Sequence, residues 1–241
     1  MTISIANSEQ EFYRLAALKV VGQIVSKPTS VIGLSTGRTT LGIHREIVAW
    51  CGAHNIYTGR ATFLGVDEVT GVDREYRGAC YAMLKSQIIG PLGIDDAHFM
   101  MLPTRSHDFA SDIAAFSRRL ADLGGIDLLL LGIGENGHLG FNQPGAAFGA
   151  GIHLDKMDPK LEARIRRETA TPPEVPLGGI TLGIRDMMHA RSIVLLANGD
   201  NKADIIRRAV ATPVSEAVPA TVLQLHPNCE YLLDSKAAAK L

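Results

Sequence analysis

A chain of 241 residues with 46% hydrophobic residues can bury a sizeable core, and this composition excludes a disordered protein. The formal net charge of −1 excludes the basic surface that binding to nucleic acid requires. The three cysteines are far apart without metal-ligand spacing, and the N-terminal residues lack the pattern of a signal peptide. We therefore expect a cytoplasmic protein with reduced thiols and no nucleic-acid or membrane partner.

The first half of the chain predicts strands that alternate with helices. Ser8 is a candidate N-cap with Glu11 three residues later, as in a capping box, and a helix is expected from there to Lys27. The predicted strands cover residues 31–34, 61–66 and 99–102, and the helices that follow them cover 39–50, 77–89 and 107–123.

The second half continues this alternation. The apolar run at 126–133 is too short to span a bilayer and too apolar for a surface helix, so it predicts a strand buried on both faces. After Pro144 the expected elements are strands at 151–154, 179–183, 192–197 and 229–233, with helical segments at 184–190, 201–210 and 221–226. No repeat or linker divides the chain. We therefore expect one α/β domain over residues 1–241, with a doubly wound, mostly parallel, Rossmann-like sheet covered by helices on both faces.

The stretch at 126–144, IDLLLLGIGENGHLGFNQP, is the strongest candidate for a functional site. Gly132, Gly134 and Gly137 let the backbone turn sharply at the carboxyl end of the strand, where ligands bind in open α/β sheets. His138 is therefore a candidate catalytic residue, although most lone histidines are structural. The stretch also contains a literal GxGxxG, but neither a long helix nor a suitably placed acidic residue follows, so a dinucleotide site is not expected.

Residues 33–40, GLSTGRTT, join the first of these predicted strands to a helix. Glycines there allow a close backbone approach, and the free N–H groups of a helix N-terminus attract an anion. We therefore predict a phosphate site here, with a plain tight turn as the alternative. GLSTG also matches the G-x-S-x-G nucleophile elbow, but in α/β-hydrolases that elbow follows several strands. The candidate phosphate ligands are Ser35, Thr36, Gly37, Arg38 and Thr39.

Asp67 and Glu68 directly follow the second of these predicted strands. Adjacent side chains of an extended segment point to opposite sides, so at most one of them faces a ligand. That carboxylate is a candidate general base, and capping of the next helix is the alternative. Lys202 begins a predicted helix, where its charge opposes the dipole, so it either binds an anion or is simply solvated. The same alternatives apply to Arg166 in the basic run at 164–167.

Taken together and in order, these motifs resemble the glucosamine-6-phosphate deaminase/6-phosphogluconolactonase superfamily. The resemblance covers nearly the whole chain and rests on GLSTGRTT, FLGVDEVTGV, IDLLLLGIGENGHLGFNQPG, GITLGIRDMMHARSIVLLANGDNKA and LQLHPN. GITLG, NGHLG and the GAC after Arg77 resemble the galactosamine-6-phosphate isomerase/deaminase branch most closely. Lactonases usually carry Asp-Glu-Arg where this chain has Asp-Glu-Val.

The resemblance implies an isomerase/deaminase that converts galactosamine 6-phosphate or glucosamine 6-phosphate to the ketose 6-phosphate and ammonia, without a metal or redox cofactor. It implies that residues 35–39 and Lys202 hold the sugar phosphate, with Arg166 as a further candidate. Asp67 is then the base that moves a proton between C2 and C1 of the opened sugar, and Glu68 supports it. His138 opens the pyranose ring.

Two positions depart from the deaminases of this superfamily. The deaminases have Asp-Gly-His where this chain has Asn136, Gly137 and His138, and they have Glu where it has Gln143. An amide can hydrogen-bond to a histidine, but it cannot stabilise an imidazolium by Coulomb attraction. We therefore expect His138 to lose its proton more easily than in the deaminases, and Gln143 to bear on substrate choice or on the rate of ring opening.

Two other functions remain as alternatives. In 6-phosphogluconolactone hydrolysis, His138 would activate water; a non-catalytic sugar-phosphate sensor would need neither this residue nor Asp67. Such sensors usually carry an added DNA-binding segment, whereas this chain starts almost at its first α/β helix. The larger deaminases are allosteric hexamers. Only DSKAAAKL follows the last predicted strand, which argues against allosteric control of that kind without deciding it, and a homo-oligomer stays compatible with the sequence.

Overall fold

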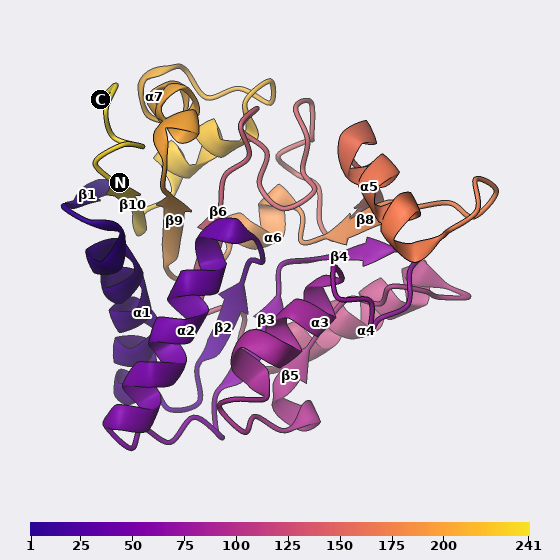
Figure 1. Ribbon diagram of the computed structural model, residues 1–241, viewed down its shortest axis with the longest axis horizontal. Helices are drawn as coiled ribbons and strands as arrows, with labels where there is room; N and C mark the ends of the chain where they lie inside the picture. The colour runs from indigo at the N-terminus through magenta and orange to yellow at the C-terminus, as the bar shows by residue number, and fades with distance from the viewer.

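The computed structural model describes residues 1–241, which form a seven-stranded sheet and a three-stranded sheet (Figure 1). The strand order of the large sheet is β1-β10-β9-β6-β2-β3-β5, and every neighbouring pair is parallel. The prediction of a doubly wound parallel sheet is therefore confirmed. Its strands are β1 (Thr2–Ala6), β2 (Val31–Leu34), β3 (Thr62–Gly65), β5 (Phe99–Met100), β6 (Leu128–Gly132), β9 (Ile193–Ala197) and β10 (Cys229–Asp234).

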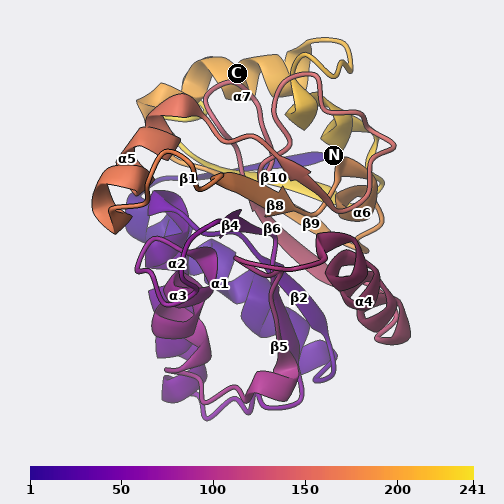
Figure 2. The same ribbon diagram turned by 90° about the vertical axis from the view of Figure 1, so that its right-hand side faces the viewer.

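Helices cover both faces of the large sheet (Figure 2). One face carries α1 (Glu9–Ser26), α2 (Arg38–Ala53), α3 (Cys80–Leu84) and the π-helical turn η1 (Lys85–Ile89). The other face carries α4 (Phe109–Asp122), α6 (Ile184–Met188), α7 (Ala203–Ala211) and the 3₁₀ segment η4 (Pro219–Leu225). The chain also forms two short 3₁₀ turns, η2 (Asp96–His98) and η3 (Asp200–Lys202). None of these helices is both long and apolar enough to span a membrane.

Strand β6 shows why the central strands are apolar on both sides. Leu128 and Leu130 join the core under α1 and α2, whereas Leu129 and Leu131 join the core under α4, α6 and α7. Successive side chains of a strand point to opposite faces, so a strand covered on both faces has no polar side. The buried strand predicted within residues 126–133 is confirmed.

The chain leaves the large sheet at Val66 and enters a second, antiparallel sheet. That sheet consists of β4 (Asp67–Thr70), β8 (Gly178–Thr181) and β7 (His153–Asp155), in the order β4-β8-β7. Asp67 and Glu68 therefore end one strand, as predicted, but also begin another, which the sequence does not reveal. Helix α5 (Pro159–Thr169) connects β7 to β8 and lies beside the small sheet (Figure 1).

The N-terminal segment differs from expectation in two details. Strand β1 was not predicted, because it has five residues and pairs with β10 at the edge of the sheet, where most of its side chains are exposed. Helix α1 begins after Ser8, whose Oγ accepts from the N–H of Glu11 at 3.1 Å. The Glu11 carboxylate binds the N–H of Asn7 at 2.7 Å, one residue earlier than in a standard capping box.

The order of the strands defines where a ligand can bind. From β2 the chain proceeds to β3 and β5 on one side, and from β6 it proceeds to β9 and β10 on the other. The direction of winding thus reverses between β2 and β6. The crevice beyond the carboxyl ends of the strands at such a reversal is the usual ligand site of an open α/β sheet.

A buried carboxylate fixes the opposite end of β6. Asp127 accepts hydrogen bonds from Lys27 Nζ at 2.8 Å, Arg191 Nη1 at 2.9 Å and the Val31 N–H at 2.9 Å, and its side chain is almost fully buried. Asp127→Ala leaves the buried Val31 N–H without its acceptor, so we expect the free energy of unfolding in urea to fall by about 2–4 kcal/mol.

The matched control is Asp204→Ala, which removes an exposed ion pair with Lys240. Exposed pairs contribute little, so we expect this variant to lose less than about 1 kcal/mol. Equal losses in the two variants would contradict the structural role of Asp127.

Candidate active site

A cavity of about 570 Å³ lies at the carboxyl ends of β9, β6, β2 and β3, at the reversal of winding. It brings together most of the site residues predicted from the sequence, although they come from distant segments. Two predicted residues, Glu68 and Arg166, do not line it. The predicted residues that do are Ser35, Thr36, Gly37, Arg38, Thr39, Asp67, Asn136, His138, Gln143 and Lys202.

One end of the cavity is the N-terminus of α2. The N-cap is Gly37, whose φ of 151° is rare for residues with a side chain, and no side chain caps the helix. The first N–H groups of α2 therefore lack acceptors within the helix, and together with the helix dipole they favour a bound anion.

The hydroxyl groups of this loop are already used within the protein. Ser35 Oγ donates to the carbonyl oxygen of Leu130 at 2.9 Å, and Thr39 Oγ1 donates to Asn198 Oδ1 at 2.7 Å. Thr36 Oγ1 donates to the sulfur of Cys80 at 3.1 Å. In this conformation an anion is consequently offered main-chain N–H groups rather than the hydroxyl protons of these three candidate ligands.

Lys202 lies at the same end of the cavity, in η3 after β9. Its Nζ donates to the carbonyl oxygen of Ile133 at 2.7 Å. Burial lowers the pKa of the Lys202 ammonium, Glu135 acts against this shift, and the nearby charge of Arg38 adds to it. A bound anion would offset the repulsion between the two cationic side chains.

The turn after β6 presents His138 to the cavity. A Cβ at Gly134 would overlap the His138 ring, and Gly137 has a φ of 90° that disfavours other residues. Gly132 meets neither condition, because a Cβ there would contact nothing. Two of the three glycines expected to shape this turn are therefore required by its geometry.

Two amides orient the His138 ring. His138 Nδ1 lies 2.7 Å from Asn136 Oδ1, and Asn136 Nδ2 donates to Gln143 Oε1 at 3.1 Å. An amide oxygen only accepts, so with this assignment of the amide the proton resides on Nδ1 and Nε2 keeps a lone pair. Burial and the charge of Lys202 lower the pKa of His138, whereas Asp158 acts in the opposite direction. The direction agrees with the expectation that a histidine held by amides loses its proton easily.

Asp67 is the first residue of β4, and its side chain lines the cavity. Burial raises the pKa of its carboxyl group to about 6, partly offset by a hydrogen bond from the Cys80 thiol. Such a carboxylate is mostly ionised at pH 7, yet it is a stronger base than one in water.

Glu68 points the other way and is fully buried. Its carboxylate accepts from the N–H groups of Val69, Cys80 and Tyr81, each at 2.7 Å. It thus caps α3, which begins three residues later than predicted, and only one of the two acids lines the cavity, as alternation along the extended segment requires. Any support that Glu68 gives to Asp67 is therefore indirect, through the position of α3.

Arg166 was wrongly placed at the phosphate. Its guanidinium binds Glu162 Oε1 at 2.7 Å and the carbonyl oxygens of Pro172 at 2.7 Å and Val175 at 3.1 Å, away from the cavity. The N-terminus of α5 instead contributes Asp158 and Leu161. Asp158 before a proline predicts a helix start, but local sequence does not tell which cavity that start faces.

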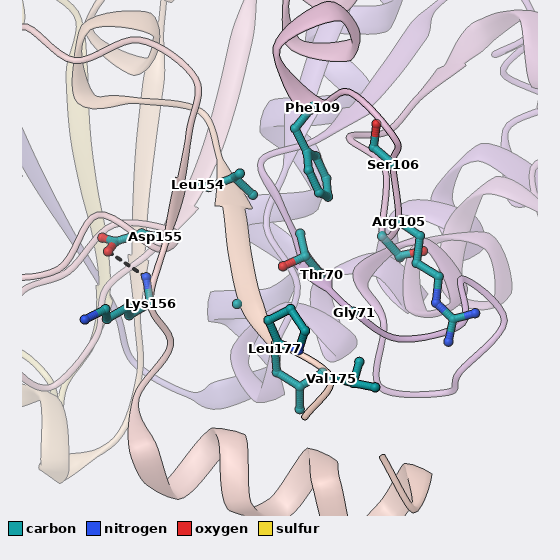
Figure 3. Close-up of a pocket in the computed structure, with 13 residues that line it drawn as sticks. Thr70, Gly71, Arg105, Ser106, Phe109, Leu154, Asp155, Lys156, Val175 and Leu177 are labelled. Atoms are coloured by element: carbon teal, nitrogen blue, oxygen red, sulfur yellow. Dashed lines mark hydrogen bonds between the residues drawn. The ribbon is translucent and has the colours of Figure 1, made fainter. Parts of the chain in front are cut away.

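A larger cavity of about 750 Å³ lies elsewhere, between the small sheet and the segment at 104–109 (Figure 3). Phe109, Leu154 and Leu177 line it, and Figure 3 shows the carboxylate of Asp155 bonded to the N–H of Lys156. This cavity is mostly apolar and no histidine lines it, whereas His138 and Asp67 line the smaller, polar cavity. No group of His, Cys, Asp or Glu side chains has the arrangement of a metal site.

Comparison with known proteins agrees with this geometry. A family model described as glucosamine-6-phosphate isomerases/6-phosphogluconolactonase matches residues 8–231. The glucosamine-6-phosphate deaminase of Clostridium acetobutylicum is 34% identical, and the match covers 100% of both chains. That of Clostridium botulinum strain Langeland is 31% identical, over 100% of this chain and 99% of the relative. These relatives do not support the expected closeness to the galactosamine branch.

Solved structures show the same fold. A monomeric glucosamine-6-phosphate deaminase has a TM-score of 0.92 and 26% identity over 100% of both chains. The 6-phosphogluconolactonase of Trypanosoma brucei has a TM-score of 0.78 and 20% identity over 100% of this chain and 98% of its own, a likeness of fold alone. The chain belongs to the glucosamine-6-phosphate isomerase/6-phosphogluconolactonase family.

Proposed function

We propose that this protein is an amino-sugar-6-phosphate isomerase/deaminase that converts glucosamine 6-phosphate to the ketose 6-phosphate and ammonia. One observation carries the proposal: a single cavity is lined by a helix N-terminus without a side-chain cap, a buried carboxylate whose pKa is raised and a histidine whose pKa is lowered. A sugar 6-phosphate has its anion at one end and its reacting carbons at the other, so the anion anchors the substrate for the chemistry.

The free N–H groups of α2 hold the phosphate, with Arg38 and Lys202 beside them. These contacts are the same in the ground state and the transition state, so they contribute to binding and orientation rather than to the chemical step. The hydroxyls of Ser35 and Thr39 hold the loop in place through Leu130 and Asn198.

His138 opens the pyranose ring. Its Nε2 has a free lone pair because Nδ1–H is bound to Asn136, so it accepts the proton of the anomeric hydroxyl and delivers it to the ring oxygen. The imidazolium exists only transiently in this step. Burial and the nearby Lys202 lower the pKa of the resting histidine and keep it neutral, which is the form that accepts a proton. Its amide partners add no negative charge that would favour the imidazolium.

Asp67 then acts on the open-chain sugar. Its carboxylate removes the proton from C2, giving an enolamine, and returns it to C1, while a proton passes from the amino nitrogen to O1, which leaves a ketimine at C2. Water adds to this carbon, and the ketose 6-phosphate and ammonia leave. The relatives' names favour glucosamine over galactosamine 6-phosphate as the substrate. The three free, buried cysteines are compatible with the cytoplasm, where we propose that the enzyme acts.

Ammonia release from purified protein tests this function. We expect ammonia from glucosamine 6-phosphate, with a higher kcat/KM than from galactosamine 6-phosphate. We expect 6-phosphogluconolactone to hydrolyse no faster with the protein than without it. Lactone hydrolysis without ammonia from either amino sugar would assign the cavity to the other activity of the family.

The pH dependence of kcat/KM tests Asp67 as the base. The base must be ionised, and its folded pKa is about 6, so we expect activity to fall as the pH falls through about 6. Asp67→Asn keeps the size of the side chain but removes the base, so it should reduce kcat at pH 7.5 by roughly 10²-fold or more. Activity in Asp67→Asn near the wild-type level would exclude this role.

An NMR titration of the imidazole nitrogens tests the amide-held histidine. We expect Nδ1 of His138 to carry the proton at neutral pH and the pKa to lie below about 6.5. Asn136→Asp should raise that pKa, because a carboxylate stabilises the imidazolium. Asn55→Asp, the same charge change beyond the C-terminus of α2, is the control and should leave His138 unaffected. A wild-type pKa above about 6.5 would contradict the assignment.

A further inference from the structure

Asp67 has one hydrogen-bond partner for its carboxylate, and that partner is a thiol. Cys80, the first residue of α3, places its Sγ 3.6 Å from Asp67 Oδ1, within reach of a hydrogen bond to the large sulfur atom. No other side chain or main-chain N–H donates to this carboxylate. The thiol is itself almost fully buried, so water has little access to it.

The hydroxyl of Thr36 sets the direction of this bond. Thr36 Oγ1 donates to Cys80 Sγ at 3.1 Å, so the sulfur accepts on that side and its single proton is available to Asp67. Burial raises the pKa of the Cys80 thiol well above its usual value, and the charges of Asp67 and Glu68 raise it further. The thiol therefore stays protonated and donates.

The backbone of Cys80 is fixed independently of its side chain. Its N–H donates to Glu68 Oε1 at 2.7 Å, and the other carboxylate oxygen of Glu68 accepts from Tyr81 at 2.7 Å. The two successive acids of β4 thus bind the same residue, one through its main chain and the other through its thiol. The main-chain bond to Glu68 and the hydroxyl of Thr36 thus hold Sγ beside the Asp67 carboxylate.

We propose that Cys80 is a positioning residue that orients the Asp67 carboxylate through its thiol and favours the ionised form. The proposal rests on the proposed role of Asp67 as the base. It also links the two ends of the cavity, because Thr36 belongs to the loop before α2 and contacts the same sulfur. The other cysteines, Cys51 and Cys229, are buried without such a partner.

The test measures the pKa of Asp67 directly, by NMR titration of protein labelled with ¹³C at the aspartate carboxyl carbon. The Asp67 signal is assigned by its loss in Asp67→Asn. We expect Cys80→Ala to raise the Asp67 pKa by about one pH unit, the scale of one hydrogen bond to a charged group. Cys80→Ser restores a donor and should bring the pKa back toward the wild-type value. Cys51→Ala, a buried thiol remote from the cavity, should leave it unchanged.

Activity provides the second measurement. The acid limb of kcat/KM should move to higher pH in Cys80→Ala and return in Cys80→Ser, with KM little changed, whereas a merely structural thiol would alter stability without moving this limb. An Asp67 pKa that is the same in the wild type, Cys80→Ala and Cys80→Ser overturns the proposal. If the wild type releases no ammonia but the Asp67 pKa responds as expected, the positioning role is supported and the proposed function is overturned.

Discussion

The site depends on the carboxylate of Glu68, which joins the start of β4 to the N-terminus of α3. A fully buried carboxylate with no cation beside it is costly, and here three N–H groups at 2.7 Å and a helix N-terminus offset that cost. Burial still raises the pKa of Glu68, to about 7. Because Glu68 faces inward, the neighbouring side chain on the extended segment must face the cavity, and the capped helix presents Cys80 to it. One structural contact thereby places both Asp67 and its thiol partner.

The second constraint is electrostatic. The end of the cavity at the N-terminus of α2 contains Arg38 and Lys202. A resting imidazolium at His138 would therefore add a third positive charge in a half-buried space. Asn136 accepts from His138 Nδ1 and donates to Gln143, so the two amides hold the ring without adding a negative charge that would favour its charged form. The histidine is thus oriented by the amides, and burial together with Lys202 keeps it neutral.

Much of this arrangement is readable from the sequence because it follows from local pattern. The apolar runs of β2, β6 and β9 predict strands covered on both faces, and the polar residues after them must then meet at one edge of the sheet. The acid pair obeys alternation, but local sequence does not say which acid faces inward. Arg166 was misplaced, and Asp158 and Cys80 were missed, because the direction of a helix relative to a cavity is set by tertiary contacts between distant segments. The sequence also does not reveal that the chain passes from β3 into the small sheet, because β4 pairs with the distant strand β8.

We propose that the cavity at the reversal of winding holds a sugar phosphate with its phosphate on α2 and its reacting carbons at Asp67. A crystal structure of the Asp67→Asn variant with glucosamine 6-phosphate tests it most directly. We expect the phosphate on the N–H groups that begin α2, beside Lys202, with C1 and C2 next to residue 67 and the ring oxygen near His138. A sugar phosphate bound in the apolar cavity by Leu154, or with its phosphate away from α2, would contradict it.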